Sequence, residues 1–216
     1  MIGVICGLRS EAKIADRLPG VLVGCSVARP QRALALARHM VSQGVTRLIS
    51  FGVAAGLSQE LVAGDVILGG SVMTAKNAWE ADAILNEKLM EELPSLMCVP
   101  VWGSQSIVRR AEDKALVLRR TGCLVTDMES QIVAQVAHEN RIPFTVIRAI
   151  SDPYDMDLPP AALVPLREDG SPDMKGVFQS IKKEPLQLPA LIRLGFNTSR
   201  ALRGLKQVVE VMREIG

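Results

Sequence analysis

Residues Val45–Leu57 read VTRLISFGVAAGL, an apolar run over Val45–Phe51 that passes into the small residues of Gly52–Leu57. An apolar run of this kind is typical of a strand that is buried on both faces of a parallel sheet. Glycine and alanine after such a strand let the backbone approach a ligand closely. The stretch therefore predicts a central strand followed by a glycine-rich loop, and taken alone this loop fits either a binding site or a tight turn.

Strand-like runs alternate with helical patterns on both sides of this stretch. The runs are Met1–Cys6, Val21–Val27, Asp65–Leu68, Met97–Val101, Cys123–Thr126 and Phe144–Ile150. The helical patterns are Gln31–Gln43, Met128–Asn140 and Ser199–Glu214. This alternation predicts an α/β protein with a mixed, largely parallel central sheet flanked by helices. A length of 216 residues fits a single domain over residues 1–216.

The segment 153–196 has a different character from the rest of the chain. Seven prolines lie between Asp152 and Pro189, and the segment ends in the apolar stretch Leu186–Phe196 (LQLPALIRLGF). Long excursions beside a site often serve as lids, so we expect 153–196 to be a lid within the single domain. The apolar Leu191, Ile192 and Phe196, with Lys and Arg beside them, fit either contact with a membrane surface or packing on the core.

Composition argues against several classes of protein. The net charge of +2 and the 3% content of aromatic residues give no basis for nucleic-acid binding. The chain has no cationic leader and no apolar run near the ~20 residues that span a bilayer. Its two histidines and four cysteines do not cluster, so we expect no metal. We expect a cytoplasmic protein, and contact with the periphery of the inner membrane stays open.

Acidic residues follow several of the expected strands. In parallel sheets, sites lie beyond the carboxyl ends of the strands, which would bring Glu11, Glu129 and Asp152 together. One carboxylate can act as a general base toward water and another can protonate a leaving group. A third can accept two hydrogen bonds from the vicinal diol of a ribose. Taken singly, each acid is equally consistent with a helix start or a turn.

Four motifs in a fixed order carry a family resemblance: SFGVAAGL, GDVI, the helix entry TDMES and the strand end SD. Together they resemble the nucleoside phosphorylase and nucleosidase superfamily. The remainder, including SDPYDMDLPP and LPALIRLGFNTSRALRGL, is similar to the hopanoid-associated phosphorylase branch. The resemblance implies a nucleoside phosphorylase-like fold, a homo-oligomer and no cofactor. It implies removal of adenine from adenosylhopane, a nucleoside lipid, during bacterial hopanoid biosynthesis.

The resemblance also implies roles for individual residues. Glu129 matches the glutamate that holds the ribose hydroxyls, and Met128 lies beneath the sugar. Asp152 matches the aspartate that protonates purine N7, and Ser151 supports it. Glu11 falls where the nucleosidases have their water-activating glutamate. The glycine-rich loop contributes substrate-binding positions, namely Phe51, Gly52, Val53 and Ala54.

The same loop bears on the identity of the nucleophile. Phosphorylases of the superfamily hold phosphate with an arginine and a serine there, whereas this chain has no arginine and has Val53 in place of the polar residue. Glu11 would repel a phosphate dianion unless Arg9 neutralises it. We therefore favour water as the nucleophile, with phosphate as the remaining co-substrate and Arg9 as its candidate ligand.

Two other functions remain open on the sequence. One is cleavage of a soluble purine nucleoside such as methylthioadenosine, and the other is a non-catalytic, membrane-associated purine-binding module. An acid at each of positions Glu11, Glu129 and Asp152 favours an enzyme, because binding alone requires no such set. The excursion and the apolar stretch favour a large apolar substrate.

Overall fold

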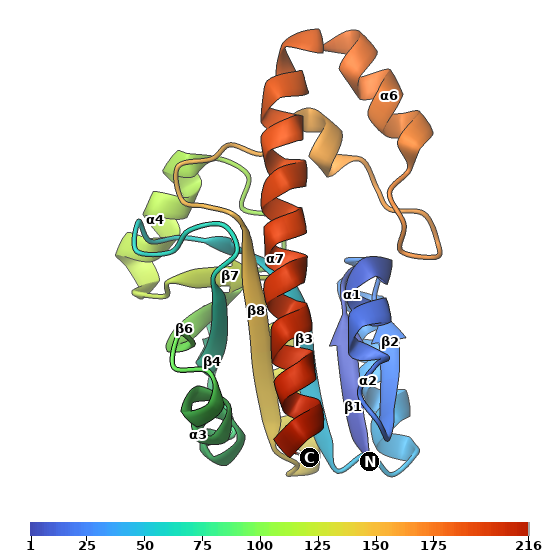
Figure 1. Ribbon diagram of the computed structural model, residues 1–216, viewed down its shortest axis with the longest axis vertical. Helices are drawn as coiled ribbons and strands as arrows, with labels where there is room; N and C mark the ends of the chain where they lie inside the picture. The colour runs from blue at the N-terminus through green and yellow to red at the C-terminus, as the bar shows by residue number, and fades with distance from the viewer. Residues whose placement is uncertain (216) are drawn as a thin grey trace.

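Eight strands and seven α-helices make up residues 1–215, the part of the chain that the computed structural model describes (Figure 1). The strands are β1 Ile2–Cys6, β2 Val21–Cys25, β3 Arg47–Gly56, β4 Val66–Met73, β5 Ala78–Glu80, β6 Met97–Gly103, β7 Val125–Asp127 and β8 Phe144–Asp152. The helices are α1 Arg9–Ala15, α2 Pro30–Ser42, α3 Ala83–Glu92, α4 Ala111–Thr121, α5 Ser130–Asn140, α6 Met174–Lys183 and α7 Leu188–Ile215. Two short 3₁₀ helices cover Pro160–Leu163 and Pro185–Gln187.

The sheet is organised around β3 and β8, which pair in parallel along most of their length. β1 pairs in parallel with both β2 and β3, and the parallel pairs β4–β6 and β6–β7 complete the other half. Three pairs are antiparallel, namely β8–β4, β7–β3 and β5–β4. The pairings among β3, β8, β4, β6 and β7 close a ring. The mixed, largely parallel sheet expected from the sequence is confirmed.

Helices cover both faces of the sheet. α2 and α5 lie over one face, and α1, α3 and α7 lie over the other, so that two apolar clusters form. β3 contributes to both clusters because successive side chains of a strand point to opposite faces. Leu48 packs with the first cluster, and Ile49 and Phe51 pack with the second.

The prediction that a loop follows Phe51 is wrong. Gly52, Val53 and Ala54 belong to β3, where they pair with residues of β8, and the register shifts only between Ala54 and Ala55. β8 supplies the hydrogen-bond partners that keep these small residues extended, and no sequence pattern could reveal that partner.

The predicted start of the last helix at Ser199 is also wrong. α7 begins at Leu188 and not at Ser199, so the stretch Leu188–Phe196 forms its first turns. Pro189 is compatible with this start, because a proline in the first turn of a helix removes no intrahelical hydrogen bond. With α6, these turns project beyond the sheet as an arm, defined here as Met174–Phe196 (Figure 1).

Candidate active site

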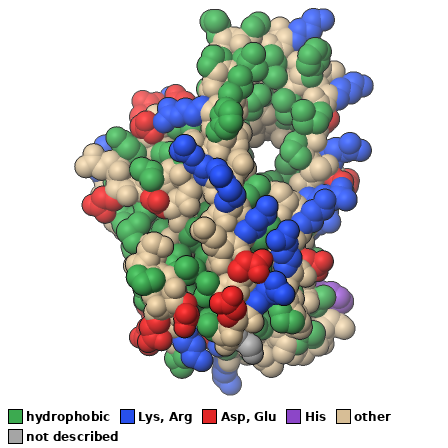
Figure 2. Space-filling model, in the orientation of Figure 1, with side chains coloured by type: hydrophobic (Ala, Val, Ile, Leu, Met, Phe, Trp, Pro, Cys, Tyr) green, Lys and Arg blue, Asp and Glu red, His purple; other side chains and the backbone are tan. Residues whose placement is uncertain are grey.

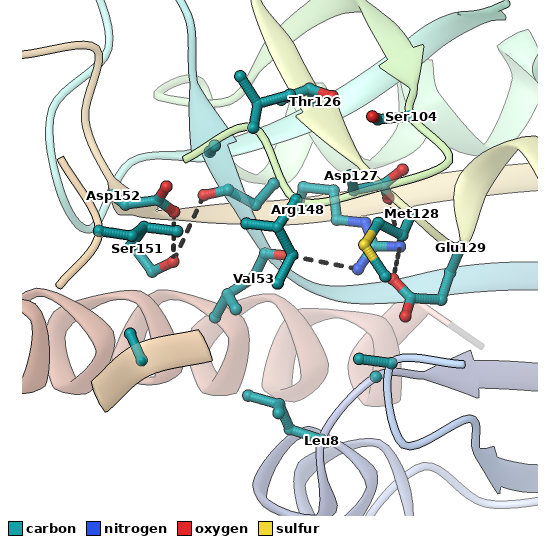
Figure 3. Close-up of a pocket in the computed structure, with 18 of the residues that line it drawn as sticks. Leu8, Val53, Ser104, Thr126, Asp127, Met128, Glu129, Arg148, Ser151 and Asp152 are labelled. Carbon is teal, nitrogen blue, oxygen red and sulfur yellow. Dashed lines mark hydrogen bonds and ion pairs between the residues drawn. The ribbon is translucent and has the colours of Figure 1, made fainter. Parts of the chain in front are cut away.

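One cavity of about 270 Å³ lies where β1, β3, β7 and β8 end (Figure 3). The sequence-predicted residues that line it are Glu11, Val53, Ala54, Met128, Glu129, Ser151 and Asp152. Much of the remaining wall is apolar and comes from Leu8, Ile107, Val108, Leu158, Ala162 and Leu194. The topology thus brings residues from opposite ends of the sequence to one place.

Glu11 lies in the first turn of α1 and is 1% exposed. Its carboxylate accepts hydrogen bonds of 2.8 Å each from the backbone N–H groups of Gly7, Leu8 and Val53. Burial raises the pKa of Glu11 to about 7, against the lowering effect of these hydrogen bonds. A Cβ atom at Gly52 would lie 2.7 Å from the carboxyl group, so glycine there leaves room for it. Backbone hydrogen bonds therefore fix the position of the Glu11 carboxyl group, and its pKa lies near neutral pH.

Glu129 stands at the entry to α5, beside Met128, and is also buried. Ser26 Oγ donates a 3.1 Å hydrogen bond to its Oε1, and Arg148 lies 3.5 Å from its Oε2 (Figure 3). Burial raises the pKa of Glu129; Arg148 counteracts this effect, and the neighbouring Asp127 adds to it. The carboxylate faces the cavity between a hydroxyl donor and a cation.

Arg148 connects the acids on this side of the cavity. It projects from β8, is 1% exposed and forms ion pairs with both Asp127 and Glu129. It also donates a 2.6 Å hydrogen bond to Ser50 Oγ. Removing one partner of a buried ion pair costs about 3–5 kcal/mol, so we infer that Arg148 is needed to keep both acids in place.

Asp152 ends β8 at the opposite side of the cavity (Figure 3). Ser151 Oγ lies 3.1 Å from Oδ1, and the ammonium group of Lys114 lies 3.1 Å from Oδ2. Lys114 is completely buried and also donates to the carbonyl oxygens of Asp152, Pro153 and Met156. Burial raises the pKa of Asp152, and the ion pair with Lys114 acts in the opposite direction.

Several residues named from the sequence lie outside the cavity. Phe51 points into the core under α7, and Gly52 is in contact with Glu11. Arg9 is half exposed and pairs with Asp169. Leu191, Ile192 and Phe196 lie on the arm, where Leu191 is partly buried and the other two are exposed.

Three further residues of the site, Arg148, Lys114 and Asp127, were not predicted from the sequence. Arg148 had a readable signal, because a lone charge inside the apolar run FTVIRAI requires a buried partner. Lys114 had none, since it looks like one more charge on a surface helix. Among residues 1–215, no three His, Cys, Asp or Glu side chains are grouped so that they could hold a metal ion.

Solved structures of similar fold include a hydrolase and a nucleosidase. The futalosine hydrolase of Helicobacter pylori strain 26695 is 15% identical with a TM-score of 0.75, and the match covers 100% of this chain and 97% of that chain. The 5'-methylthioadenosine/S-adenosylhomocysteine nucleosidase of Neisseria meningitidis, in complex with methylthio-immucillin-A, is 16% identical with a TM-score of 0.74. That match covers 99% of this chain and 98% of the other. At this identity the likeness concerns the fold.

The sequence also matches a family model. The model described as the phosphorylase superfamily matches residues 10–163, well over half of the chain, and this range contains Glu11, Glu129 and Asp152. This protein therefore belongs to the phosphorylase superfamily of enzymes.

Proposed function

We propose that this protein hydrolyses the N-glycosidic bond of an adenine nucleoside that carries a large apolar group, with adenosylhopane as the substrate. The observation that carries the proposal is the convergence of Glu11, Glu129 and Asp152, all buried, on one largely apolar cavity. Buried acids with raised pKa values are concentrated at functional sites.

Asp152 is the general acid that protonates the adenine base. Its protonated carboxyl group transfers a proton to N7 of adenine while the bond between N9 and C1′ breaks, so adenine leaves as a neutral molecule. Positive charge develops on the sugar ring at the same time. As Asp152 becomes a carboxylate, Lys114 stabilises its new charge at 3.1 Å. This interaction is stronger after proton transfer than before it, as catalysis requires.

Glu129 and Glu11 act on the sugar and on the nucleophile. Glu129 accepts hydrogen bonds from the two ribose hydroxyls, and Met128 contacts the underside of the sugar. Glu11 takes one proton from a water molecule, whose oxygen bonds to C1′. A base with a pKa of about 7 is well matched to this task at neutral pH. Exchange with solvent then returns Glu11 and Asp152 to their starting states.

The surroundings of Glu11 favour water over phosphate. Arg9, the candidate phosphate ligand, pairs with Asp169, and the nearby Arg29 and Arg32 pair with Glu168. The cavity's own arginine, Arg148, already faces two carboxylates.

We expect adenine release to proceed at the same rate with and without inorganic phosphate. The measurement is release of free adenine by the purified protein in phosphate-free buffer, with the sugar product identified by mass spectrometry. A strict requirement for phosphate, with a sugar 1-phosphate as product, would show that the enzyme is a phosphorylase.

The second candidate substrate is methylthioadenosine, favoured by the structural likeness to the Neisseria nucleosidase. Both nucleosides share adenine and ribose, so only the group at the 5′ carbon distinguishes them. The apolar wall, which includes Leu158, Ala162 and Leu194, suits the polycycle. We expect a higher kcat/KM for adenosylhopane in detergent than for methylthioadenosine, and the reverse order would assign the protein to the soluble substrate.

Lys114→Met is expected to lower kcat by about 10–100-fold, within the range of single electrostatic contributions to catalysis. It should also shift upward the limb of the pH profile on which Asp152 loses its proton, because loss of the ammonium group raises the pKa of Asp152. The measurement is kcat/KM against pH, with Lys88→Met on the exposed surface of α3 as the matched control. If the limb on which Asp152 loses its proton does not move, Lys114 only stabilises the turn that follows β8.

A further inference from the structure

The arm (Met174–Phe196) contains an amphipathic helix whose apolar side the fold covers only in part. In α6, the apolar Met174, Val177, Phe178 and Ile181 recur at helical spacing, and no residue of α6 is fully buried. Val177 and Ile181 are partly buried, and α6 packs against the two 3₁₀ helices, whereas Phe178 is 69% exposed and Met174 68% exposed. An amphipathic helix normally buries such a stripe against the protein, so the exposed part of this one lacks a partner.

The apolar surface continues past α6. Leu186, in the short turn before α7, is 96% exposed, and Ile192 and Phe196 lie four residues apart on an exposed side of α7. Figure 2 shows hydrophobic side chains gathered on the face of the arm that it presents, with Lys and Arg side chains at the edge. Contiguous exposed apolar surface of this kind marks an interaction site.

The charges of the arm indicate the chemistry of its partner. The arm contains four basic residues, Lys175, Lys182, Lys183 and Arg193, and one acidic residue, Glu184. Arg193 pairs with Asp155, whereas none of the three lysines pairs with a carboxylate within residues 1–215. Apolar side chains beside unpaired lysines are the features of helices that lie in the interface of anionic bilayers.

We propose that the arm docks this protein on the surface of an anionic membrane. Phe178 and Leu186 enter the boundary between headgroups and acyl chains, and the lysines bind lipid phosphates. A second copy of the chain fits less well, because a two-fold contact through the arm would bring the lysines of both copies together. Within residues 1–215, no helix is both long and apolar enough to cross a membrane. Docking therefore uses the interface alone.

The same part of α7 also borders the cavity, to which it contributes Leu194 and Thr198. A docked arm would thus hold the cavity beside the lipid. The docking proposal stands on the arm's own residues and can be tested without any substrate.

The test is flotation of the full chain with vesicles of phosphatidylcholine alone or with added phosphatidylglycerol. We expect the protein to float with the anionic vesicles only. Phe178→Asp with Leu186→Asp should weaken the binding at least tenfold, since it removes two apolar anchors. Lys182→Gln with Lys183→Gln should weaken it about 30-fold, at about one factor of five for each charge lost. The matched control is Ile84→Asp on α3, an isoleucine 68% exposed outside the arm, which should float like the wild type.

Circular dichroism and thermal unfolding establish that each variant folds. Equal flotation of the wild type and both arm variants would overturn the proposal. So would light scattering that shows a dimer in lipid-free buffer for the wild type and a monomer for Phe178→Asp with Leu186→Asp, because the arm would then bind a second copy.

Discussion

Asp152→Asn is expected to lower kcat for adenine release by about 1,000-fold, the scale of a lost general acid. Asparagine keeps the size of the side chain and its contact with Ser151 but has no acidic proton for N7. Lys114 keeps its three backbone carbonyl partners in the variant, which should offset part of the about 3–5 kcal/mol that loss of a buried ion-pair partner costs. The limb of the kcat/KM profile that reports loss of the proton from Asp152 should disappear.

The measurement is single-turnover adenine release across pH, with thermal unfolding as the test of folding. Asp155→Asn, three residues away on the exposed surface, is the matched control and should keep wild-type rates. Wild-type kcat in Asp152→Asn would remove the leaving-group role and with it the proposed mechanism.

Glu11→Gln is expected to lower kcat by about 100–1,000-fold, since the attacking water then has no base. Wild-type activity should rise with pH up to about 7, where Glu11 becomes ionised. The variant should lack this rise. Asp16→Asn, exposed at the end of the same helix, is the matched control. An acid limb that survives in Glu11→Gln would assign it to another group.

The same substitution should change how stability depends on pH. The pKa of Glu11 is raised in the folded state, so the folded protein binds this proton more tightly than the unfolded chain. The resulting stability is present at pH 4.5 and below and is lost as pH rises through about 7. Between pH 5 and 8 the wild type should therefore lose about 2–3 kcal/mol of unfolding free energy relative to Glu11→Gln. Urea unfolding at the two pH values measures this difference.

Much of the site was readable because strand ends can be located from apolar runs. Glu11, Glu129 and Asp152 each follow such a run, and the fold brings all three to one cavity. Phe51 was expected to bind substrate, but the pleat of β3 points this side chain into the core. Lys114 could not be recognised as a site residue, because its contact with Asp152 depends on the packing of α4 against the end of β8.

For the arm, too, the sequence shows which residues are apolar or basic, and the structure shows which of them are exposed. The apolar residues of Leu186–Phe196 and their basic neighbours are evident in the printed sequence, but core packing and an exposed surface would use the same letters. Only the start of α7 at Leu188 and the exposure of Ile192 and Phe196 distinguish the two.

The sequence by itself determined the α/β class, the strands other than β5 and the acids that follow three of them, because these depend on local periodicity and on residue chemistry. Only the tertiary structure decided that Gly52–Gly56 continues β3 and that Arg148 and Lys114 form ion pairs with the buried acids. It also decided that Met174 and Phe178, on the apolar side of α6, are exposed. Each of these depends on contacts between segments distant in the chain, and the energy of such contacts is set by burial that no local pattern records.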